Sequence, residues 1–196
     1  TGDFIYGFLG VTTGFSRYSI SGNSWSARAA SPSGVAGGAS LVYPGTGNFI
    51  YAFRGWSGSE FWRYSISGNS WATMTAAPDG VGWGGDLCYP GSGDFIYAFQ
   101  GNGTTTFWRY SISGNSWSII AQTPDGVGTG GSLVYPGTGN FIYAFRGDGT
   151  TTFWRYDFSS EMSWTTRTNA PAGVGWGGRL VSTGNDFIYG FPGNWT

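Results

Sequence analysis

The residues best suited by type to bind a ligand are tryptophans, arginines and aspartates in the variable loops of a repeated segment. An indole offers a flat apolar face, and guanidinium groups and carboxylates hydrogen-bond hydroxyls, so these side chains together suit a carbohydrate. The candidate ligand-binding residues are Trp56, Trp83, Trp176, Arg54, Arg146, Asp79 and Asp125. The alternative is structural: Trp83 and Trp176 pack against neighbouring loops, and Asp79 and Asp125 hold turns.

Catalytic chemistry has little support in this sequence. Glycoside hydrolysis needs two carboxyl groups about 5–10 Å apart, and Asp79 and Asp125 occupy equivalent loops of adjacent repeats. The chain has no histidine and one cysteine, Cys88, which excludes a Ser-His-Asp triad and an intrachain disulfide and leaves too few ligands for zinc. We therefore expect no enzyme activity, no catalytic residue, no metal and no cofactor. A glycosidase or lyase is the alternative that the aspartate pair leaves open.

Charge and composition narrow the choice of partners and location. A net charge of −1 and a charged fraction of 10% give no basic surface for nucleic acid, and no apolar run is long enough for membrane insertion. Low charge, abundant Gly, Ser and Thr, and Asn-x-Thr triplets at Asn102 and Asn194 favour an extracellular or cell-surface location. The chain begins at Thr1 rather than Met, so we expect it to be processed or to be part of a longer protein.

One unit of roughly 46 residues repeats along the chain. The segment Phe-Ile-Tyr-(Gly/Ala)-Phe begins at Phe4, Phe49, Phe95, Phe141 and Phe187. A second segment, Arg-Tyr-Ser-Ile-Ser-Gly-Asn-Ser-Trp, drifts only in its last copy and begins at Arg17, Arg63, Arg109 and Arg155. The sequence predicts a single domain, 1–196, with repeats at about 3–47, 48–93, 94–139 and 140–185 and a partial fifth at 186–196.

Each unit is typical of four short strands and shows no helical periodicity. In one unit the strands fall at about 131–135, 141–145 and 152–158, and the fourth starts at Trp164. The strand at 141–145 is apolar on both faces, which indicates a sheet that is covered on both sides. The pair Gly130-Gly131 permits a close approach of the first strand to a central axis. These features predict an all-β fold, a β-propeller of four four-stranded antiparallel blades.

A tyrosine that stands seven residues before a tryptophan, after an apolar strand ending in glycine, resembles the kelch repeat. The pairs are Tyr18–Trp25, Tyr64–Trp71 and Tyr110–Trp117. The Gly-Gly pair of kelch blades is half kept, as in Arg54-Gly55, so the resemblance is to a divergent kelch-like repeat and covers nearly the whole chain. It implies the propeller fold and no particular ligand. The segments Phe-Trp-Arg-Tyr and Gly-Asn-Ser-Trp also resemble tandem kelch-like arrays of microbial surface proteins.

Side chains that recur in every unit are expected to build the scaffold. The repeated tryptophans should pack between blades; they are Trp25, Trp71, Trp117 and Trp164. The repeated arginines, which need partners when buried, should hydrogen-bond loop carbonyls; they are Arg17, Arg63, Arg109 and Arg155. Cys88 stands where other repeats have valine, and it should be a small buried apolar side chain.

The strand count leaves one strand over, at the C-terminus. The Phe-Ile-Tyr strand occurs five times, which gives seventeen strands where four closed blades need sixteen. Three explanations stay open: the chain is a window of a longer array, the two end copies compete for one place, or the extra strand pairs with another subunit. We expect a non-enzymatic, extracellular, structural protein that self-associates through surplus or edge strands. The alternative is a lectin-like module that binds glycans through the variable loops of one face.

Overall fold

The chain folds into antiparallel sheets joined by glycine-rich turns. The computed structural model describes residues 2–159, 161–184 and 187–194, and these residues form seventeen strands and no helix. Accordingly, nothing in the described ranges is a helix that could cross a membrane. The seventeen strands fall where the sequence predicts them, including the surplus one.

Three sheets have four strands each, in chain order. The first full sheet comprises β4 (Ser40–Val42), β5 (Phe49–Phe53), β6 (Phe61–Ser65) and β7 (Ser70–Thr73). The second full sheet comprises β8 (Asp86–Cys88), β9 (Phe95–Phe99), β10 (Phe107–Ser111) and β11 (Ser116–Ile119). The third full sheet comprises β12 (Ser132–Val134), β13 (Phe141–Phe145), β14 (Phe153–Asp157) and β15 (Trp164–Thr166).

Two smaller sheets flank the full ones. The N-terminal sheet comprises β1 (Phe4–Phe8), β2 (Phe15–Ser19) and β3 (Ser24–Ala27). The C-terminal sheet comprises β16 (Arg179–Ser182) and β17 (Ile188–Phe191). The repeat aligns β4, β8, β12 and β16 as the first strand of a unit and β1, β5, β9, β13 and β17 as the second.

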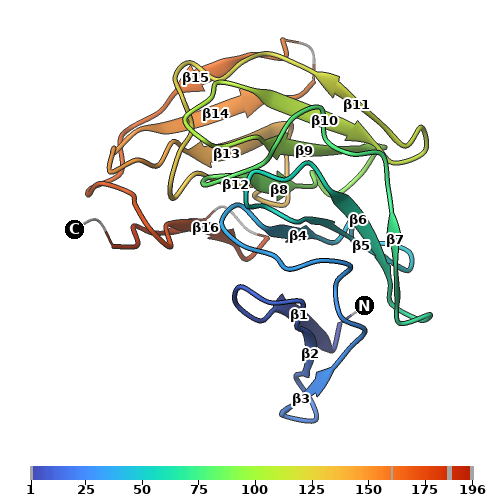
Figure 1. Cartoon of the computed structure of the whole chain (residues 1–196). Coiled ribbons are helices and arrows are strands. Elements are labelled where there is room, and N and C mark those ends of the chain that lie inside the picture. Colours follow the sequence, from blue (N-terminus) through green and yellow to red (C-terminus); the bar gives the residue numbers. More distant parts are fainter. Residues whose placement is uncertain (1, 160, 185–186, 195–196) are drawn as a thin grey trace.

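The five sheets follow one another around an open arc (Figure 1). The first strands, β4, β8, β12 and β16, lie next to one another in succession near the centre. The two smaller sheets occupy the two ends of the arc, and in the described residues each pairs only within itself. The all-β, propeller-like class is confirmed. The four complete blades of the prediction are not, because three sheets are complete and β16 pairs with β17 rather than with β1.

Neighbouring sheets meet through the same aromatic side chains at each interface. Phe61 of β6 contacts the rings of Tyr110 and Trp117 edge to face, with centroids 4.7 and 4.9 Å apart. The indole N–H of Trp117 donates to the carbonyl oxygen of Thr75 at 3.0 Å, which anchors the connection between the sheets. The same ring contact joins Phe15 to Trp71 and Phe107 to Trp164. The predicted packing of tryptophans between blades is confirmed at these three interfaces.

The repeated arginines have a different partner from the one expected. Each guanidinium lies between 4.0 and 4.4 Å from the centroid of a phenylalanine ring, in the pairs Arg17–Phe4, Arg63–Phe49, Arg109–Phe95 and Arg155–Phe141. Arg63 is opposite Tyr51 in register, so Phe49 is its diagonal neighbour on the same face. The expected bonds to loop carbonyls are wrong: Nε of Arg109 donates to Ser118 Oγ, and three Nε atoms are buried without a hydrogen bond, those of Arg17, Arg63 and Arg155. A cation–π contact takes the place of the carbonyl.

The first strands approach one another through glycine. Gly84 has a φ of +86°, and a Cβ on it would collide with the carbonyl oxygen of Gly128 in the next connection. Gly38 and Gly130 stand in the same relation to Gly82 and Gly175. The predicted close approach at the axis is therefore confirmed, and it requires both a positive φ and the absence of a side chain.

Candidate functional site

Two of the predicted ligand-binding residues, Trp83 and Trp176, are brought together by the fold. Their ring centroids are 4.5 Å apart and their planes are inclined by 46°. The rings meet because the loops before β8 and β16 both reach the centre of the arc, where the indole of Trp83 also lies over the backbone of Gly37. Even so, 48% of Trp83 and 56% of Trp176 stays exposed. Packing between loops and an open aromatic surface therefore coexist at this pair.

The other predicted ligand-binding residues bond to residues of the surrounding loops, and Arg146 and Asp125 bond to each other. Arg54 pairs with Glu60 at 2.8 Å, and its Nε donates to the carbonyl oxygen of Gly34. Arg146 pairs with Asp125 at 3.0 Å. Asp79 accepts from the N–H of Gly80 and Asp125 from that of Gly126, so their predicted role in holding turns is confirmed. Trp56 is exposed on the loop after β5, and its backbone N–H donates to the carbonyl oxygen of Gly37.

A polar cluster that sequence reasoning missed lies at the start of the first strands, where Asp86 and Arg179 each follow a tryptophan of the pair by three residues. Asp86 is fully buried and accepts hydrogen bonds from Ser40 Oγ at 2.7 Å, Ser132 Oγ at 3.3 Å and the N–H of Leu133 at 2.8 Å. Arg179 Nη2 lies 3.0 Å from its Oδ1. The signal was present in the sequence, since Ser40, Asp86, Ser132 and Arg179 precede the same leucine of the repeat. The four side chains tie together the first strands of four consecutive units.

Cys88 lies two residues beyond Asp86 and is buried. Burial raises the pKa of its thiol, and the negative charge of Asp86 raises that pKa further, while Arg179 opposes the shift. The thiol therefore stays protonated and unreactive. The prediction of a small buried apolar side chain at Cys88 is confirmed.

The outer face of the N-terminal sheet exposes side chains that the repeat buries elsewhere. Ile5 is 55% exposed, whereas its equivalents Ile50 and Ile96 are 4% and 0% exposed. Trp25, the equivalent of the packed Trp71, is also exposed, so the predicted packing between blades is wrong for this tryptophan. We call this surface the N-terminal face; it comprises Ile5, Ile20 and Trp25.

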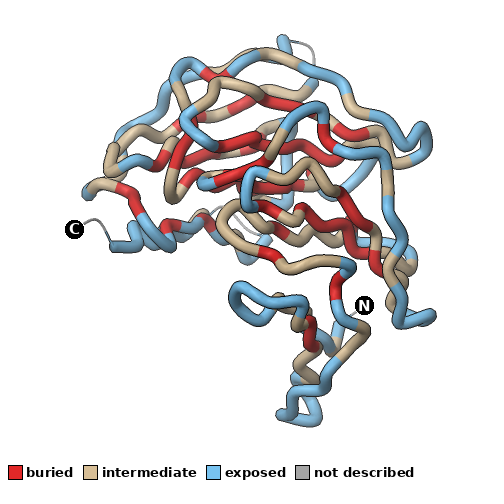
Figure 2. The backbone as a smooth tube through the Cα atoms, viewed as in Figure 1, coloured by how far each residue is buried: buried red, intermediate tan, exposed pale blue. Residues whose placement is uncertain are grey.

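The C-terminal sheet exposes the opposite half of the same interface. Tyr189 is 52% exposed, whereas its equivalents Tyr51 and Tyr97 are 2% and 4% exposed. We call this surface the C-terminal face; it comprises Val181, Tyr189 and Phe191. Figure 2 shows the contrast, with buried residues concentrated in the strands of the middle of the arc and mostly exposed residues at both ends.

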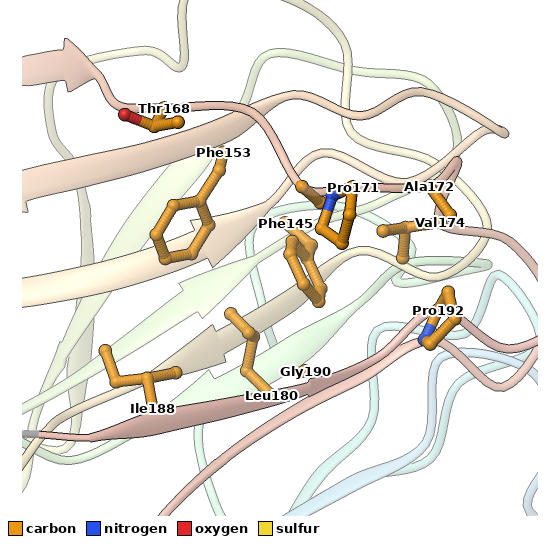
Figure 3. A pocket seen from close by; sticks show the side chains of 11 residues that line it. Phe145, Phe153, Thr168, Pro171, Ala172, Val174, Leu180, Ile188, Gly190 and Pro192 are labelled. Atoms are coloured by element: carbon orange, nitrogen blue, oxygen red, sulfur yellow. The ribbon is translucent and has the colours of Figure 1, made fainter.

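Each end of the arc also carries an apolar hollow. The C-terminal hollow, about 370 Å³, lies between the third full sheet and the C-terminal sheet and is lined among others by Phe145, Phe153, Leu180 and Ile188 (Figure 3). The N-terminal hollow, about 260 Å³, lies between the N-terminal sheet and the first full sheet. It is lined by Gly2, Phe4, Tyr6, Leu41, Tyr43, Ile50 and Ile66.

The sheets and their interfaces define a propeller-like all-β protein. No family model matches the sequence, and no curated protein matches it. Comparison with solved structures finds 288 matching chains.

One of these solved structures is that of YjhT. It superposes with a TM-score of 0.73 over 94% of this chain and 68% of that chain, at 17% sequence identity. At that identity the likeness shows the fold alone.

Proposed function

We propose that this chain is a non-enzymatic repeat protein of kelch-like propeller blades that acts by self-association, as a structural component outside the cell or at its surface. The observation that carries the proposal is that the two ends of the arc expose opposite halves of one interface. The N-terminal face carries the equivalents of Ile96 and Trp117, and the C-terminal face carries those of Tyr51 and Phe53. Inside the arc these four side chains belong to one cluster.

The composition of the two faces supports contact between copies. Burying one such side chain contributes about 1.5–3 kcal/mol, and each face exposes three of them. The contact is heterologous, since it joins the C-terminal end of one copy to the N-terminal end of another. Heterologous contacts close into rings or continue as fibres, and either product suits a structural role.

We expect Tyr189→Asp to abolish self-association. Placing a carboxylate in an apolar interface costs several kcal/mol, which weakens association on the order of 100-fold or more. Light scattering over a range of concentrations should give masses above 20.9 kDa for the unaltered protein and 20.9 kDa for the variant.

The matched control for this test is Ile119→Asp. Ile119 is also exposed, but it lies on β11, an outer strand of a full sheet, and belongs to neither end face. This variant should assemble like the unaltered protein. A single 20.9 kDa species for the unaltered protein at every concentration would count against self-association.

A second candidate function is carbohydrate binding, which the Trp83–Trp176 pair supports. Two exposed indoles with centroids 4.5 Å apart, inclined to each other, offer a surface on which a sugar ring can stack. Ser57, Asn102 and Asp148 on the loops around the centre supply polar groups, of which the first two are hydrogen-bonded to each other.

Trp83→Ala should remove glycan binding while leaving the fold intact, because half of this side chain is already in solvent. Binding is measured first on a glycan array and then by calorimetry with the strongest ligand. Trp25→Ala, which removes an exposed indole from the N-terminal face, is the control and should bind normally. Equal binding by both variants, or no binding by the unaltered protein, would dismiss this candidate.

A further inference from the structure

Resting on the proposed self-association, we infer that two copies build one composite blade from their opposite ends. β16 of one copy supplies the first strand, and β2 and β3 of the second copy supply the third and fourth strands. The second strand is β17 of the first copy or β1 of the other copy. The surplus strand is then the one of these two that is displaced.

β1 and β17 are interchangeable by sequence. Residues 4–8 and 187–191 both read Phe-Ile-Tyr-Gly-Phe, whereas the three internal copies have alanine at the fourth position, as Ala52, Ala98 and Ala144. The partner of this position also changes, because Gly7 pairs with Ser16 where Ala98 pairs with Trp108. β1 and β17 therefore share a glycine in place of the usual alanine. This glycine matches the third strand that has serine in place of tryptophan, β2.

The C-terminal hollow is the place of a missing third strand. Between the first and second full sheets, Trp108 and Tyr110 of β10 complete a cluster with Phe53, Phe61 and Leu87. The C-terminal hollow is lined by the equivalents of the last three, which are Phe145, Phe153 and Leu180. The described C-terminal sheet has only first and second strands, so the equivalents of Trp108 and Tyr110 do not enter this hollow.

β2 fits this place in detail. It carries Ser16 and Tyr18 where β10 carries Trp108 and Tyr110. A serine suits the hollow better than a tryptophan because Phe145 already occupies part of it: its ring lies 2.7 Å from where a Cβ of Gly190 would stand. The glycine of the end strands and the serine of β2 are thus complementary to the same ring, that of Phe145.

The N-terminal hollow is the place of a missing first strand. In the first full sheet, Val42 of β4 packs on the cluster that contains Tyr51 and Ile96. The N-terminal hollow is lined by the equivalents of these two, Tyr6 and Ile50, and the described N-terminal sheet has no strand in the position of β4. β16 carries Val181, the equivalent of Val42, which is exposed where it stands.

One composite sheet therefore fills both hollows at once. It also covers the open edge of the retained second strand, that of β17 by pairing with β2 or that of β1 by pairing with β16, which is otherwise available for strand addition. A second copy supplies the missing strands, and only the displaced end strand, β1 or β17, leaves its place in the arc. Within one chain, by contrast, the end sheets lie at opposite ends of the arc (Figure 1), where Asp86 binds Arg179 and the N-terminal sheet packs on β5 and β6.

Disulfide trapping between copies tests the composite blade. In a Cys88→Val background, one sample mixes Arg17→Cys with Tyr189→Cys, and a second mixes Ile5→Cys with Ser182→Cys. The first pair reports β2 beside β17, because Arg17 faces Tyr6, the equivalent of Tyr189. The second reports β16 beside β1, because Ser182 faces Ile188, the equivalent of Ile5. The register control mixes Arg17→Cys with Phe191→Cys. Phe191 lies two residues beyond the expected partner position, Tyr189, so these two cysteines are too far apart for a disulfide.

We expect a covalent dimer in at least one of the two mixtures and none in the register control. Association by light scattering without a disulfide in either mixture would overturn the composite blade and leave self-association standing. A disulfide within a single chain that carries both Arg17→Cys and Tyr189→Cys, at monomer mass, would overturn it in favour of intramolecular closure. A protein that stays monomeric throughout would overturn both proposals.

Discussion

Asp86→Ala is expected to lower the free energy of unfolding by about 3–5 kcal/mol, the range for removing one partner of a buried charged cluster. The carboxylate is fully buried and binds Ser40, Leu133 and Arg179. Alanine would leave two hydroxyls and the backbone N–H of Leu133 without this acceptor, and each buried unsatisfied group costs about 1–3 kcal/mol. The loss is large because the partners come from three different strands around the centre of the arc.

Urea unfolding followed by tryptophan fluorescence measures this loss. The control is Asp94→Ala, since Asp94 also accepts two hydrogen bonds, from Ser111 Oγ and the N–H of Ser113, but lies near the surface at a turn. Its loss should be well under half of that for Asp86→Ala. Asp86→Ser, which introduces the residue of two other repeats, should recover part of the stability. Equal losses for the two alanine variants would show that the central cluster contributes no more to the free energy of unfolding than a surface turn does.

The strands could be predicted from the sequence because their determinants are local. Each Phe-Ile-Tyr segment is bounded by glycine-rich turns, and the tyrosine-to-tryptophan spacing fixes how the third and fourth strands pair, as Tyr64 opposite Trp71 shows. The partner of the repeated arginine was missed because this contact is not local in the sequence. Arg63 and Phe49 become neighbours only through the diagonal geometry of two paired strands, and a pattern along the chain does not display that contact.

The candidate site depends on features that lie beyond any single repeat. Trp83 and Trp176 come from alternate units and meet only because of the curvature of the arc. The central cluster was hidden because one repeat position holds serine twice, then aspartate and arginine, which reads as drift. A carboxylate surrounded by donors is what lets Asp86 bind Ser40, Ser132 and Arg179. The surplus strand could be counted from the sequence, but two identical segments give no local basis for deciding which of them pairs with β2.

Gly84→Ala is the second substitution with a large expected effect, a loss of about 2–6 kcal/mol in the free energy of unfolding. Two costs add. A side chain at a φ of +86° carries backbone strain of about 1–3 kcal/mol, and the new Cβ would collide with the carbonyl oxygen of Gly128. Backbone oxygen cannot rotate away as a flexible side chain can, so β8 and the connection to β12 must separate, at about 1–3 kcal/mol more.

Gly93→Ala separates these two costs. Gly93 has nearly the same φ, +89°, but lies at a turn where a Cβ would meet no atom within 4 Å. Its loss in urea unfolding should therefore equal the strain alone, and the excess at Gly84 measures the close approach of neighbouring first strands. If the two losses were equal, the close contact between Gly84 and Gly128 would relax at little cost, and the four first strands could shift relative to one another. A rigid centre, by contrast, fixes the curvature of each arc. The two ends of one chain then cannot close on each other, and a second copy must bind at the open ends.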